Sequence, residues 1–197
     1  MVVIHPIKLR GRWREGFALD RHIVSSTYIG DNEYGHPMFD TKRTEIGELT
    51  YRLKYKDDNS VVGEIAVTAA QFVKSWSPGV SVIIPAPPSN QTRPQQPVFV
   101  LAQAIGERLS LPVRQGCVTR TKNLPQLKDV RDAATRLLLL RDVHTVDQNV
   151  IENQKVLLFD DVFQSGATLN AVAEAVYENG HASDVFALTM TITQARP

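Results

Sequence analysis

The sequence predicts an α/β domain in which a central, mostly parallel β-sheet is flanked by helices. From residue 80 onward, short β-branched segments typical of buried strands alternate with segments of helical apolar periodicity. Parallel strands need crossover connections, and the helical segments supply them on both faces of a sheet. The chain has 197 residues, of which 43% are hydrophobic and 22% charged, so about one domain with a real core is expected.

Composition excludes several classes of protein. Lys and Arg total 22 and Asp and Glu total 21, so a net charge of +1 gives no bulk attraction to nucleic acid or anionic lipid. The single cysteine excludes an internal disulfide framework and a cysteine-built zinc site, and it fits a reducing compartment. No apolar run reaches the ~20 residues of a membrane span, and the start of the chain lacks the pattern of a secretory signal. We therefore expect a cytoplasmic protein.

The first elements are predicted as follows. Residues 1–43 show weak periodicity, and we expect an irregular or short-stranded N-terminal appendage, or a hood, before an α/β domain over residues 44–197. Ile46, Leu49 and Leu53 share the spacing of one helix face, which Asp57–Ser60 interrupts. A second helix follows, and Ser77–Gly79 ends it.

The remaining elements alternate strand and helix. A loop with five prolines separates the first strand from the next helix, and a polar stretch at 119–135 predicts a long loop. The apolar runs predict strands at 80–84, 113–118, 155–159 and 185–190, and helices around 98–109 and 169–176.

The stretch from Lys155 to Gly180 carries the chemistry. An apolar strand is followed by Asp160 and Asp161, then by a loop over 162–166, and then by a helix. A helix N-terminus offers free backbone N–H groups to a phosphate, and Gly166 lets the backbone approach it closely. Ser165 and Thr168 add hydroxyl donors. The carboxylates suit sugar hydroxyls or a divalent cation, so the expected ligand resembles a 5-phosphoribosyl group. A solvated acid pair with a helix cap is the plainer alternative.

Residues Leu157 to Thr168 resemble the PRPP-binding signature of the type I phosphoribosyltransferases. Gln164 stands where that family commonly has Thr, and no Walker A or dinucleotide-binding glycine motif is present. The resemblance implies a type I phosphoribosyltransferase-like fold, in which Asp160 and Asp161 hold the ribose hydroxyls and bind Mg²⁺, directly or through water. It also implies that the 5-phosphate is bound by the backbone N–H groups of Phe163, Gln164, Ser165, Gly166, Ala167 and Thr168.

Other segments are similar to the ComF-like branch of that family. They are Leu53-Lys54-Tyr55, the strand and proline loop from Val82 to Ser89 with Arg93 and Gln96, and the stretch from Arg120 to Gln126. The N-terminal zinc ribbon common in that branch is absent from this sequence. The resemblance implies pyrophosphate binding by Pro88, Ser89 and Arg93, and a closing loop that contains Arg120, Thr121, Lys122 and Gln126.

Three functions follow from these patterns. The first is a Mg²⁺-dependent phosphoribosyltransferase that moves the 5-phosphoribosyl group of PRPP to a small nitrogenous acceptor and releases pyrophosphate. The second is a non-catalytic PRPP or nucleotide sensor on the same fold. The third is a ComF-like accessory protein in DNA uptake or processing. No motif in the sequence identifies the acceptor. A homodimer is the expected oligomeric state, because dimers are the commonest assemblies.

Two further groups of residues lie outside these motifs. Arg10, Arg12, Trp13 and Arg14 interleave cations with an aromatic side chain, which occurs in nucleic-acid binding, but a packed Trp in a solvated segment is the simpler interpretation. The histidines lack the spacing of metal ligands, and we interpret them as surface or packing residues; they include His22, His36, His144 and His181.

Overall fold

The computed structural model describes residues 1–88, 93–120 and 144–193, and it has a five-stranded central sheet. The strand order is β1-β2-β9-β8-β5, and all neighbours are parallel except β1 and β2. The mostly parallel α/β sheet predicted from the sequence is therefore confirmed. The strands are β1 (Ile7–Lys8), β2 (Glu15–Arg21), β5 (Val82–Pro85), β8 (Lys155–Phe163) and β9 (Asp184–Ile192).

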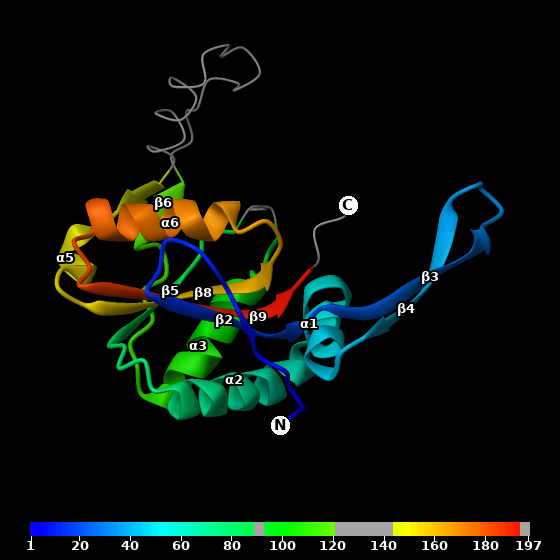
Figure 1. Cartoon of the computed structure of the whole chain (residues 1–197), viewed down its shortest axis with the longest axis horizontal. Coiled ribbons are helices and arrows are strands. Elements are labelled where there is room, and N and C mark those ends of the chain that lie inside the picture. Colours follow the sequence, from blue (N-terminus) through cyan, green and yellow to red (C-terminus); the bar gives the residue numbers. More distant parts are fainter. Residues whose placement is uncertain (89–92, 121–143, 194–197) are drawn as a thin grey trace, which may run out of the picture.

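Helices cover both faces of the sheet (Figure 1). One face carries three helices, α1 (Glu45–Lys56), α2 (Val62–Trp76) and α3 (Pro97–Leu109). The other face carries α6 (Ala167–Glu178) together with the short α5 (Gln148–Ile151) and a two-stranded sheet of β6 (Val118–Arg120) and β7 (His144–Val146). Within the described residues, no helix is both long and apolar enough to cross a membrane.

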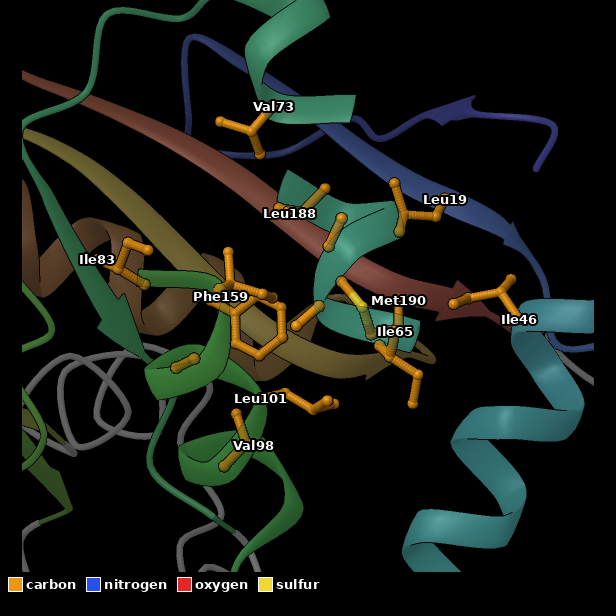
Figure 2. Close-up of a cluster of buried hydrophobic side chains, with 14 of the residues drawn as sticks. Leu19, Ile46, Ile65, Val73, Ile83, Val98, Leu101, Phe159, Leu188 and Met190 are labelled. Atoms are coloured by element: carbon orange, nitrogen blue, oxygen red, sulfur yellow. The ribbon is translucent and has the colours of Figure 1, made fainter. Parts of the chain in front are cut away.

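The core explains why β8 and β9 occupy the middle of the sheet. Val156–Phe159 of β8 and Val185–Leu188 of β9 are continuous, buried apolar runs, as expected for strands that are covered on both faces. Phe159 of β8 is fully buried among side chains from α2, α3 and β9, including Ile65, Leu101 and Leu188 (Figure 2). Burial of such side chains stabilises the fold by roughly 1.5–3 kcal/mol each.

The predicted boundaries of the first two helices are confirmed. The hydroxyl of Thr44 accepts a hydrogen bond from the backbone N–H of Gly47 (3.0 Å) and caps α1. Asp57 takes a left-handed conformation (φ 50°) and ends that helix, and Asp58 caps the 3₁₀ turn Asn59–Val61 that leads into α2.

Two strand predictions were wrong in extent. A strand was predicted over 113–118. In the structure Val113 makes one isolated bridge to Ile83, a turn through Gly116 (φ 76°) follows, and β6 begins only at Val118. The strand expected to end at Phe159 continues to Phe163, because Val162 and Phe163 pair with Thr191 and Ile192 of β9. The acid pair therefore lies within the strand, and the loop that follows is only Gln164–Gly166.

The N-terminal segment contributes to two different parts of the molecule. Residues 7–21 add β1 and β2 to the central sheet, and the backbone of β2 is parallel to β9. Residues 23–43 then form a separate antiparallel hairpin of β3 (Ile23–Asp31) and β4 (Pro37–Arg43), which projects away from the sheet (Figure 1). The division into domains at residue 43 stays a prediction.

Candidate functional site

A cleft of about 460 Å³ lies where the parallel strands β2, β5, β8 and β9 end. The carboxyl edge of an open α/β sheet is the usual place for a ligand. The cleft is lined by residues from the ends of these strands, from the loop before α6, from the proline-rich loop and from α1; they include His22, Lys54, Pro88, Arg93, Asp160, Asp161 and 163–168.

The two carboxylates of the acid pair have different environments. Asp161 is buried, and the Lys54 ammonium lies 3.1 Å from its Oδ1 and 2.9 Å from its Oδ2. Asp160 accepts a hydrogen bond at Oδ1 from the backbone N–H of Asp161 (2.8 Å). Lys54 thus holds the Asp161 carboxylate in one orientation and neutralises it, whereas no ion pair with a described residue neutralises Asp160.

Burial and charge shift the pKa values of groups in this cleft. Burial, together with the adjacent Asp161 carboxylate, raises the pKa of Asp160, and Lys54 opposes this shift. Burial lowers the pKa of His22, and the nearby cations Arg43 and Lys54 lower it further. The site therefore favours an uncharged His22 and disfavours a second negative charge beside Asp161.

The raised pKa of Asp160 predicts a pH-dependent stability. Below the ordinary carboxyl pKa of 3.8, Asp160 is protonated in both the folded and the unfolded state. Above it the unfolded chain loses this proton first, so this group lowers the free energy of unfolding as pH rises toward its folded-state pKa. We expect the melting temperature of Asp160→Asn to exceed that of the parent at about pH 8 and to equal it at about pH 4. A gain of equal size at both pH values, or a gain in the exposed control Asp40→Asn, would contradict this.

The loop before α6 has the geometry of an anion site. Gly166 has φ 74°, and a Cβ there would lie 2.6 Å from Cζ of Phe163, so only glycine fits. Asn170 fixes this turn, because its backbone N–H and its side-chain amide both donate to the Gly166 carbonyl (2.9 Å each). The N-cap residue Gly166 has no side chain to cap α6, and among the described residues only a weak hydrogen bond from the Ala167 N–H to the Ser165 hydroxyl occupies the first N–H groups, which border the cleft.

The structure brings all six predicted phosphate-binding residues to the cleft. Gln164, Ser165, Ala167 and Thr168 are exposed there, and the Ser165 hydroxyl accepts a weak hydrogen bond from the Ala167 N–H (3.4 Å). Phe163 belongs to β8, and its ring packs edge-on against Trp13 with centroids 6.3 Å apart. The binding role of each of these residues stays a prediction.

Other predicted residues lie in different places. Pro88 and Arg93 line the cleft, and the Arg93 guanidinium lies 5.8 Å from the ring centroid of Tyr55. Arg120 ends β6 and lines an adjoining, mainly apolar pocket of about 880 Å³, which shares Pro88 and Arg93 with this cleft. The remaining members of the predicted set fall outside the described residues; they are Ser89, Thr121, Lys122 and Gln126.

Sequence reasoning missed His22 and Lys54 as site residues. His22 directly follows β2, lines the cleft, and has Nδ1 3.0 Å from Oγ1 of Thr191, so the interpretation as a residue outside the site was incomplete. Lys54 was noted only as part of the Leu-Lys-Tyr segment. The sequence offered only one sign of its role, a single Lys on the buried side of a helix. Its partner Asp161 lies 107 residues away, so no local pattern joins the two.

The interpretation of the basic N-terminal segment as a packed one is supported. The indole N–H of the buried Trp13 donates to the Leu9 carbonyl (3.2 Å). Arg12 and Arg14 form ion pairs with Glu174 (2.7 Å) and Asp184 (2.6 Å). Two of the three arginines thus have internal partners, which reduces the charge that this segment offers to nucleic acid.

The residues present can supply a small part of a metal site. Within residues 1–88, 93–120 and 144–193, no three His, Cys, Asp or Glu side chains form a ligand cluster. Mg²⁺ commonly keeps several waters and uses one or two carboxylates plus substrate phosphates. The acid pair fits that limited role, with Asp160 the freer ligand because Lys54 already contacts both oxygens of Asp161.

Comparisons with known proteins agree with the geometry. No family model matches the chain. It is 26% identical over 144 residues to the competence protein ComFC of Bacillus subtilis strain 168, a match over 73% of this chain and 58% of ComFC. The solved glutamine PRPP amidotransferase of B. subtilis superposes with a TM-score of 0.53 at 17% identity, over 81% of this chain and 34% of that one. A structure described as the allosteric regulatory enzyme of purine biosynthesis matches equally.

Proposed function

We propose, from the type I phosphoribosyltransferase fold of this chain and its similarity to ComFC, that it is a Mg²⁺-dependent phosphoribosyltransferase. It would transfer the 5-phosphoribosyl group of PRPP to a small nitrogenous acceptor and release pyrophosphate. One observation carries the proposal: the acid pair and the N-terminus of α6, which is capped only by a weak bond to Ser165, open into the same cleft. That combination matches a ligand that presents a phosphate beside a diol.

The loop from Gln164 to Thr168 would bind the 5-phosphate. Its backbone N–H groups and the positive end of the α6 dipole both favour an anion. The hydroxyls of Ser165 and Thr168 line the cleft and add donors. Gly166 lies against the ring of Phe163, and that ring packs against the hydrophobic core. This contact holds the loop in place.

The acid pair would hold the ribose. Carboxylate oxygens accept hydrogen bonds from sugar hydroxyls, and Lys54 keeps the Asp161 carboxylate oriented before the ligand arrives. Such preorganisation reduces the cost of ordering on binding. We assign Asp160 and Asp161 as the catalytic residues on this ground.

The reaction exchanges one bond at C1 of the ribose for another. The bond from C1 to the pyrophosphate oxygen breaks and carries its electron pair to pyrophosphate, while the acceptor nitrogen forms the new bond and releases its proton to solvent. Arg93 and the loop at Pro88 line the cleft and would face the leaving group. Mg²⁺, bound with pyrophosphate and the acid pair, would neutralise the charge that develops there.

The change Asp161→Asn tests the ligand assignment. It removes one charge-assisted contact of about 1.5–2 kcal/mol, so we expect PRPP affinity to fall about 10–30-fold in titration calorimetry with Mg²⁺. Asp184→Asn is the matched control, because it also breaks an ion pair with a basic residue but lies at the opposite end of the sheet. Retained affinity in Asp161→Asn, or an equal loss in the control, would remove the acid pair from PRPP binding.

The similarity to ComFC favours a second candidate, an accessory role in competence through DNA uptake or processing. Release of pyrophosphate from PRPP in the presence of candidate bases separates the two. Binding of PRPP without release would identify a sensor. Salt-sensitive binding of single-stranded DNA, with no binding of PRPP, would favour the competence role.

A further inference from the structure

One ring nitrogen of His22 is available to a ligand in the cleft. His22 directly follows β2, lines the cleft and is only 8% exposed. Its Nδ1 lies 3.0 Å from Oγ1 of Thr191, whereas Nε2 has no hydrogen-bond partner among the described residues. Because Nε2 is not enclosed by described atoms either, a ligand can reach it, and the cleft is the space that this residue borders. A buried polar group of this kind needs a partner, which a bound ligand can supply.

The Thr191 hydroxyl decides which ring nitrogen of His22 carries the hydrogen. Thr191 is fully buried, and within the described part of the chain His22 Nδ1 is the one hydrogen-bond partner of its hydroxyl. A buried hydroxyl with a single partner satisfies its proton only by donating, and an unsatisfied buried donor is costly. Thr191 therefore donates to Nδ1, and the hydrogen of the neutral imidazole lies on Nε2. A protonated ring also carries hydrogen at Nε2, so this atom is a donor in either charge state.

The strand order places His22 on the side of the acid pair from which an acceptor must approach. This step rests on the proposed function, in which pyrophosphate leaves toward Pro88 and Arg93. Along the carboxyl edge of the sheet the order is β5, β8, β9, β2, so the proline-rich loop after β5 and His22 after β2 lie on opposite sides of the acid pair in β8. In a single displacement at a sugar carbon, the incoming group attacks the face opposite the leaving group. The attacking nitrogen therefore arrives from the side of β9 and β2.

We propose that His22 binds the acceptor by donating a hydrogen bond from Nε2 to a lone pair on the acceptor ring. The matching group is a carbonyl oxygen or an unprotonated ring nitrogen, so the acceptor is a nitrogen heterocycle of lactam or amidine type rather than a simple amine. Because Nε2 already carries its hydrogen, His22 orients the acceptor and does not remove the proton of the attacking nitrogen. The nearby cations Arg43 and Lys54 act on the same imidazole, and their positive potential favours an electron-rich atom beside it.

Binding of product nucleotides measures this contact without requiring turnover. Titration calorimetry with Mg²⁺ compares PRPP with uridine 5′-monophosphate and adenosine 5′-monophosphate. The amide of His22→Asn falls near the position of Nδ1, so this variant should lose about tenfold more affinity for the better-bound nucleotide than for PRPP, the scale of one lost hydrogen bond. The amide of His22→Gln falls near Nε2 and should keep the nucleotide affinity within about threefold of the parent. His181→Asn is the matched control, because His181 is exposed and lies between α6 and β9, at the opposite end of the sheet.

The position of the ring hydrogen is a second readout, and it needs no ligand. Nitrogen NMR spectra of the full chain should show the hydrogen of the neutral His22 ring on Nε2, and Thr191→Val should remove this preference. Hydrogen on Nδ1 in the parent would overturn the inference. Binding of PRPP together with equal losses for PRPP and nucleotide in His22→Asn would overturn this inference alone. A parent that binds neither PRPP nor a nucleotide would overturn the proposed function as well.

Discussion

Replacing Lys54 with Met is expected to lower the free energy of unfolding by about 3 kcal/mol, the scale for removing one partner of a buried ion pair. The Lys54 side chain is 25% exposed and the Asp161 side chain 12%, so water replaces the lost contact poorly. The Asp161 carboxylate is then left without its cation, next to Asp160. Urea unfolding at about pH 8 measures the effect, because the raised pKa of Asp160 shows that the folded state disfavours a second charge beside Asp161, which is then unpaired.

A double variant separates the lost charge balance from lost packing. Lys54→Met with Asp161→Asn removes both charges, and most of the stability should return. Lys74→Met, on an exposed position of α2, removes a lysine without an ion pair among the described residues and should change stability little. If the double variant is as unstable as Lys54→Met alone, the ion pair is not the cause.

The substitution Gly166→Val is expected to weaken PRPP binding by about 100-fold. A β-branched residue disfavours φ 74°, and its Cβ would collide with the Phe163 ring. The loop must then move, and the loss of one or two charge-assisted bonds to the 5-phosphate corresponds to about 3 kcal/mol. Titration calorimetry with PRPP and Mg²⁺ gives the affinity, and a thermal melt shows that the variant is folded.

Gly79→Val is the matched control for backbone strain. Gly79 has φ 67°, but a Cβ at this position would meet no other atom within 4 Å, and the residue lies between α2 and β5, away from the cleft. The variant should lose stability and keep its PRPP affinity. An unchanged affinity in Gly166→Val would mean that the phosphate is bound elsewhere.

The sequence predicted those features that depend on neighbouring residues. Short apolar runs marked the strands β5, β8 and β9. The acid pair, Gly166 and the start of α6 could be recognised because they belong to one continuous stretch. Strand β2 was harder, because Glu15 and Asp20 break its apolar pattern and its pairing with β9 joins residues about as far apart as the chain allows. His22 and Lys54 were missed for the same reason: only the folded sheet brings them to the acid pair.

The position of Asp160 and Asp161 inside β8 has a consequence for how this site can change. Their backbone is fixed by the register with β9, in which Asp160 lies opposite Thr189, so folding alone sets where the carboxylates stand. A substitution that changes the size of a side chain in this stretch would disturb the sheet as well as ligand binding, unlike a change from Asp to Asn. A side chain that enters the cleft from a loop, such as Arg93, carries no such constraint, whereas Lys54 is tied to Asp161 by its ion pair. Attempts to change which ligand the cleft accepts should therefore begin with the loop positions and leave the strand unchanged.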